Sequence, residues 1–61
     1  MNVEMLFKMG KNKFIEVAKK TNSYTEFINY LEQQPNFQII KIMNEDSKKL
    51  LYSLTMLEIE K

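Results

Sequence analysis

Few side chains in this 61-residue sequence could act as nucleophiles or general bases, because it contains neither cysteine nor histidine. A serine nucleophile would then need a lysine or a carboxylate as its base, and no local motif supplies that pairing. Ser23 instead begins the pattern Ser23-Tyr24-Thr25-Glu26, which has the S-x-x-E form of a helix-capping box. Ser47 lies in a polar break and is interpreted as a turn residue. We therefore expect no catalytic residues and a protein that is not an enzyme.

Metal and cofactor chemistry has equally little support in the sequence. The acidic pairs are Glu45-Asp46 and Glu58-x-Glu60, and neither has the ligand count or the glycine spacing of a calcium loop. Phosphate-binding loops need several glycines, whereas this chain has one. The sequence predicts neither a metal site nor a bound cofactor.

Lysines are distributed unevenly along the chain. Residues 1–20 contain five lysines and two glutamates, a net charge of +3, whereas residues 21–40 have a net charge of −2. Such lysines can contact nucleic-acid phosphates without reading sequence. The chain has no arginine, the usual reader of guanine edges, so base-specific DNA recognition is disfavoured. One candidate function is therefore a non-specific nucleic-acid-binding protein that uses Lys8, Lys11, Lys13, Lys19 and Lys20.

Apolar periodicity suggests which elements position these side chains. Apolar residues recur at every second position over residues 3–9, and this period predicts a strand with one buried face. A turn at residues 10–13 and a second strand at residues 14–20 would complete a first hairpin. The capping box begins a helix at Tyr24, and Pro35 ends it because proline disfavours helical geometry at the residue before it.

The last third of the chain predicts a second hairpin. Two apolar runs, residues 36–43 and 50–57, flank a short polar break. The expected fold is a single small α+β domain over residues 1–61, with a four-stranded, mainly antiparallel sheet and one helix packed on one face (ββαββ). The alternative is a βαββ chain in which residues 13–34 are helical.

The second face of this predicted sheet has no helix to cover it, since one helix of about three turns covers one face. Full burial of a Leu, Ile or Phe side chain contributes roughly 1.5–3 kcal/mol. Contiguous exposed apolar side chains commonly mark interaction sites. The predicted protein interface on this open face, with Phe14 as its aromatic anchor, consists of Leu6, Phe14, Ile40, Ile42 and Leu51.

The sequence thus favours a small non-enzymatic interaction protein over a nucleic-acid binder. A chain of this length buries a small core, and self-association is a common way to stabilise such a domain without disulfides or a metal. The expected partner is a second copy in a homodimer, or another protein that the chain regulates or inhibits. The methionines expected to fill the core are Met5, Met9, Met43 and Met56.

Neither a membrane-spanning segment nor a leader is evident. No apolar run approaches the roughly 18 residues that a bilayer-spanning helix needs. The first residues lack the charged region and apolar block of a signal peptide. We expect a cytoplasmic protein without a membrane partner.

Overall fold

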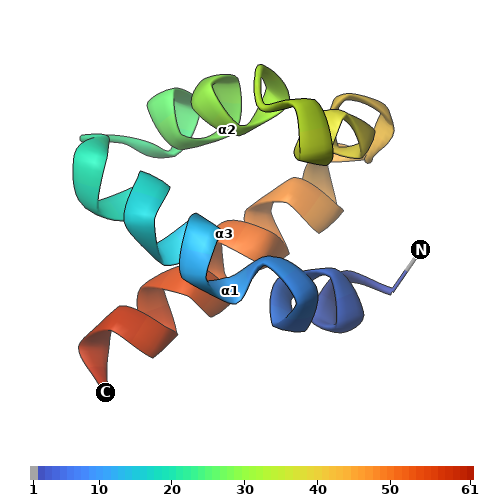
Figure 1. The fold of residues 1–61 in the computed structure, drawn as a ribbon. Coiled ribbons are helices and arrows are strands. Elements are labelled where there is room, and N and C mark those ends of the chain that lie inside the picture. Colours follow the sequence, from blue (N-terminus) through green and yellow to red (C-terminus); the bar gives the residue numbers. More distant parts are fainter. Residues whose placement is uncertain (1) are drawn as a thin grey trace.

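Helices make up the whole described fold. The computed structural model describes residues 2–61, and the fold is 85% helix, with four helices and no strands in this range. The elements in chain order are α1 (Val3–Lys20), α2 (Tyr24–Glu32), the 3-10 helix η1 (Pro35–Ile42) and α3 (Glu45–Glu60). In Figure 1, α1 crosses α3 in the lower part of the molecule and α2 runs above them. The predicted α+β sheet, in both its ββαββ and βαββ forms, is wrong.

Residues 3–20, predicted as a hairpin, form the helix α1. Asn2 caps it, since the Asn2 Oδ1 atom accepts hydrogen bonds from the backbone N–H of Glu4 at 2.9 Å and of Met5 at 3.3 Å. Val3 and Leu6 point into the core three residues apart. The alternating apolar pattern was misleading because two of its members, Met5 at 62% and Met9 at 83% exposure, face outward and do not fill the core.

Gly10 bends α1 and does not form a hairpin turn. Its φ of −115° and ψ of 17° depart from helical values within the helix. A Cβ atom at this position would lie 2.7 Å from Phe37 Cε1 and 2.9 Å from Phe14 Cζ. Glycine is therefore required here by the close approach of two aromatic rings to the backbone, which lets Phe14 and Phe37 pack with their centroids 5.0 Å apart.

The helix predicted from the capping box is confirmed as α2. Ser23 Oγ accepts a hydrogen bond from Glu26 N at 3.2 Å, and Glu26 Oε1 accepts one from Asn22 N at 3.1 Å. Residues 13–34 are not one helix, because the chain is non-helical from Thr21 to Ser23. α2 ends at Glu32, before Pro35.

The predicted second hairpin is replaced by η1 and α3. Asn44 caps α3, with its Oδ1 atom accepting from Ser47 N at 2.8 Å, and Glu45 and Asp46 occupy the first helical turn. These polar residues resemble a turn in sequence, but Asn followed by acidic residues is also the pattern of a helix N-terminus, where the helix dipole favours negative charge. The predicted second hairpin and its turn are therefore wrong.

Side chains from all four helices meet in one core. Phe14 of α1, Phe27 and Leu31 of α2, Ile40 of η1 and Leu51 of α3 are fully buried. Tyr52 extends this cluster from α3, with its ring centroid 5.0 Å from that of Phe27. Within residues 2–61, no helix is both long enough and apolar enough to cross a membrane.

Candidate interaction surfaces

Four of the five residues predicted as an exposed interface belong to the core. Leu6 is buried in α1, and Phe14, Ile40 and Leu51 have no exposed surface, whereas Ile42 is 82% exposed. The expected open sheet face is absent from residues 2–61, and at helical spacing these four side chains turn inward. Only Ile42 among the five is available to a partner.

The geometry of η1 explains why Ile42 is exposed while Ile40 is buried. A 3-10 helix has three residues per turn, so side chains three apart share a side. Phe37, Ile40 and Met43 pack on the core in this way, whereas Ile39 and Ile42 face outward. The outward pair borders a hollow of about 270 Å³ whose lining is Val3, Ile39, Ile42, Met43, Asn44 and Ser47.

The five lysines of the nucleic-acid hypothesis all lie on α1, but they do not form one unpaired basic patch. Lys11 Nζ lies 2.8 Å from Glu58 Oε1 of α3. Glu16 Oε2 is 3.4 Å from Lys13 Nζ and 2.9 Å from Lys20 Nζ. Hydrogen bonds from Lys20 and then Lys13 lower the pKa of Glu16, and the bond to Glu16 raises the pKa of Lys20. Three of the five lysines are thus paired with carboxylates of their own chain.

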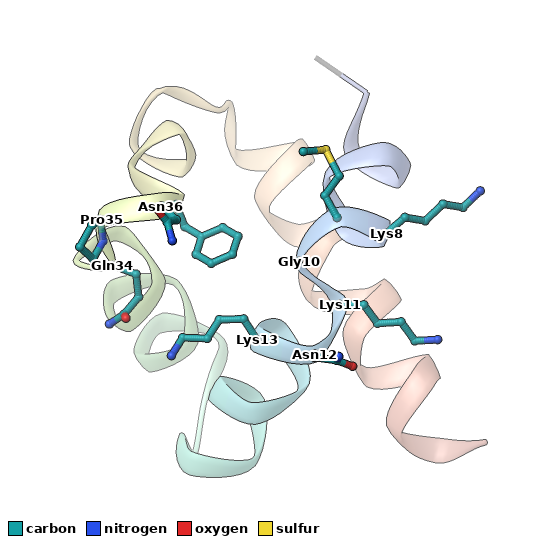
Figure 2. Close-up of a pocket in the computed structure, with 10 residues that line it drawn as sticks. Lys8, Gly10, Lys11, Asn12, Lys13, Gln34, Pro35 and Asn36 are labelled. Carbon is teal, nitrogen blue, oxygen red and sulfur yellow. The ribbon is translucent and has the colours of Figure 1, made fainter.

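A groove of about 580 Å³ lies where the bend of α1 faces the start of η1 (Figure 2). We call it the bend groove; its lining comes from residues 8–13 and 34–37. Lys13 and Gln34 extend on the groove side in Figure 2, whereas Lys8 and Lys11 extend away from it on the other side of α1. The lining of the bend groove therefore combines lysines with several carboxamides, and it contains no serine, threonine or carboxylate side chain.

A second groove, of about 360 Å³, lies between α1 and α3 and is mainly apolar. Phe7, Leu54 and Leu57 line what we call the α1–α3 groove, and Leu57 is 60% exposed. Hydrogen bonds from Lys11 and then Lys61 lower the pKa of Glu58 at its rim. The charged rim residues are Glu4, Lys8, Lys11, Glu58 and Lys61.

Leu50 adds to this surface, since it lies on the outer side of α3 and is 46% exposed. Leu50, Leu54 and Leu57 have the i, i+4, i+7 spacing of one helix side. A strand over residues 50–57 with Leu51 on its open face would place Leu50 and Leu54 on the covered face, because side chains alternate along a strand. The strand prediction therefore missed this surface. Recognising Asn44 as a helix cap would have revealed the helical spacing that follows it.

Polar contacts elsewhere join the helices. Lys48 Nζ of α3 lies 3.1 Å from Glu32 Oε2 of α2. The Tyr24 hydroxyl donates a hydrogen bond to Glu45, and burial, followed by that bond, raises the pKa of Tyr24 to about 12. In the described part of the chain, no group of three or more acidic side chains is placed to hold a metal ion. The ion pair and the tyrosine hydrogen bond both join α2 to α3.

Comparison with known proteins found no matching family model, no matching curated protein and no matching solved structure. The exposed surfaces of the chain are therefore the basis of the proposed function.

Proposed function

We propose that this chain is a non-enzymatic protein-interaction protein that binds its partner through the α1–α3 groove and the adjoining leucines of α3. The observation that carries the proposal is the exposure of Leu50 and Leu57 beside an apolar groove, in a chain that buries Leu51 of the same helix completely. Full burial of a leucine side chain contributes roughly 1.5–3 kcal/mol, so a partner that covers these residues gains free energy.

The spacing of these leucines fits a particular mode of binding. Amphipathic helices dock in apolar grooves through anchors at i, i+3 or i+4, and i+7. Leu50, Leu54 and Leu57 provide such anchors on α3, and Phe7 of α1 provides the opposite wall of the groove. The charged rim supplies polar contacts around an apolar centre, the arrangement typical of protein interfaces.

The nucleic-acid alternative receives less support from the same geometry. Lys11, Lys13 and Lys20 already bond to Glu58 or Glu16, and a phosphate backbone would have to displace these carboxylates. Lys8 and Lys11 also lie on the opposite side of α1 from Lys13 (Figure 2). Binding to nucleic acid would therefore be weak, since few lysines are free to neutralise phosphates.

Site-specific photo-crosslinking in living cells tests the proposed function. A benzophenone side chain replaces Leu57 in one variant and Thr25, an exposed residue of α2, in a control variant. We expect crosslinks to a protein partner, of either the same or a different sequence, from position 57 and few from position 25. Equal crosslinking at both positions, or none at position 57, would contradict the proposal.

A further inference from the structure

Five side chains on the outer side of α3 form a stripe with an acidic end, an apolar middle and a basic end. At 3.6 residues per turn, all five lie within roughly 80° of one another around the helix axis. Leu50 and Leu57 are exposed, and Leu54 is half-buried on the side of α1. The members of this α3 stripe are Asp46, Leu50, Leu54, Leu57 and Lys61.

We infer that a second copy of the chain docks on the α3 stripe, with the two α3 helices antiparallel and related by a two-fold axis. The inference rests on the proposed function and names its partner. When the pair is centred between Ser53 and Leu54, Leu50 of one copy faces Leu57 of the other. Asp46 then faces Lys61 of the second copy. The two-fold axis repeats every contact, as an isologous interface requires.

Charge complementarity favours this partner and this orientation. Asp46 has no ion-pair partner in the described chain. Lys61 Nζ lies 3.2 Å from Glu58 Oε2, but its side chain is 75% exposed. Because an ammonium group has three donors, Lys61 can bond to a second carboxylate. A parallel pair would instead place Asp46 against Asp46 and Lys61 against Lys61, and like charges oppose association.

The apolar middle of the stripe supplies the attraction, and the charged ends set the direction. Phe7 borders Leu54 and Leu57 in the α1–α3 groove, so α1 gives the incoming helix a second apolar neighbour. An interface centred on one helix of each copy lies at the small end of the range, below about 1,200 Å². We therefore expect a reversible equilibrium between monomer and dimer.

Sedimentation equilibrium on the full 61-residue chain, from about 10 µM to about 1 mM, tests the inference in a range suited to weak association. Leu57→Asp is the disrupting variant and Ile42→Asp is its matched control. Both substitutions replace an exposed apolar side chain with a carboxylate, and Ile42 lies outside the α3 stripe. Far-UV circular dichroism checks that both remain helical.

The wild type and Ile42→Asp should dimerise alike. Leu57→Asp should weaken association at least about a hundredfold, because it places two carboxylates, one from each copy, among the leucines of the paired α3 stripes. A wild type that stays monomeric throughout would overturn the inference. Equal loss of association in both variants would also overturn it.

A charge-exchange cycle tests the antiparallel orientation at exposed positions that do not support the core. The two-fold axis gives the dimer two contacts between Asp46 of one copy and Lys61 of the other. Asp46→Lys or Lys61→Asp turns both of them into contacts between like charges, and each variant should weaken the dimer about tenfold. The double variant exchanges the charges and should regain most of the affinity. A double variant as weak as the two changes combined would overturn the antiparallel pair.

The two proposals fail in distinguishable ways. If the purified chain is monomeric while a crosslinker at position 57 captures a different protein in cells, the dimer is overturned and the proposed function stands. If position 57 captures nothing in cells, the proposed function fails as well.

Discussion

Two sides of α3 use the same residue type for opposite purposes. Leu51 is completely buried and packs in the core with Thr55, whose hydroxyl donates to the Leu51 carbonyl oxygen at 2.8 Å. Leu50, the adjacent residue, is 46% exposed and lies on the α3 stripe with Leu57. Leu51 on the inner side of α3 therefore holds the fold together, and the half-buried Leu54 packs against the same core. Leu50 and Leu57 on the outer side can be removed without disturbing the core.

The largest difference is expected between Leu51→Ala and Leu57→Ala. Removing a fully buried leucine typically costs about 2–5 kcal/mol, enough to unfold most molecules of a small domain. Leu57→Ala should change the free energy of unfolding of the monomer by less than about 0.5 kcal/mol. Urea unfolding at low protein concentration measures both values. Similar losses in the two variants would show that the outer leucines also support the monomer.

Gly10→Ala extends the comparison to the inner side of α1. Alanine at an ordinary exposed helix position is more favourable than glycine by about 1 kcal/mol. Here its Cβ atom would meet Phe37 at 2.7 Å and Phe14 at 2.9 Å, and the Phe14 ring is fully buried. We expect a loss of about 1–3 kcal/mol from overpacking.

Thermal unfolding of Gly10→Ala beside Asn12→Ala checks this expectation, because Asn12 is an exposed residue of the same helix. A stabilised Gly10→Ala protein would contradict the close packing of α1 against Phe37.

Ion pairs should show a similar contrast between protected and exposed positions, with smaller differences in the free energy of unfolding. Lys48 and Glu32 join α3 to α2 at 3.1 Å, with 15% and 23% of their side chains exposed. A double-mutant cycle with alanine should give a coupling free energy of up to about 1 kcal/mol for this pair. The more exposed pair Lys20 and Glu16 serves as the control and should give a smaller coupling, because solvent screens it. Equal coupling in both cycles would argue against the protected position of Lys48.

The contribution of Tyr24 to stability should change with pH only in alkaline solution. Its folded pKa of about 12 exceeds the ordinary value of 10.0, so its contribution is complete below pH 10.0 and is lost as the pH rises through about 12. Tyr24→Phe removes the ionisable hydroxyl and with it this loss of stability. It leaves every lysine in place, so the variant and the wild type differ in this one ionisable group. Urea unfolding at about pH 9 and about pH 11.5 should show a smaller decrease for the variant than for the wild type. An equal decrease would mean that Tyr24 ionises alike in both states.

Local signals in the sequence predicted α2, because Ser23 and Glu26 mark its start and Pro35 follows its last residue by three positions. The other elements could not be assigned from apolar spacing alone. The alternating apolar residues at the start of α1 fit a strand, and only packing decides that Val3 and Leu6 turn inward while Met9 does not.

Residues at the start of α3 carried an ambiguous signal for a different reason. Asn44, Glu45 and Asp46 have side chains that favour both turns and helix N-termini. Interpreting them as a turn placed Leu51 on an exposed face and Leu50 on a buried one, the reverse of what the structure shows. The α3 stripe could therefore not be predicted from the sequence without first assigning α3 as a helix.

Distances between spin labels test the antiparallel pairing of α3 most directly. The chain has no native cysteine, so Ser53→Cys and Glu60→Cys each provide a single labelling site on the exposed side of α3. In the antiparallel dimer, labels at position 53 lie close to the two-fold axis, and labels at position 60 should be about 20 Å farther apart along the helices. Short distances at both positions would indicate a parallel pair, and no distance between copies at either position would contradict the dimer.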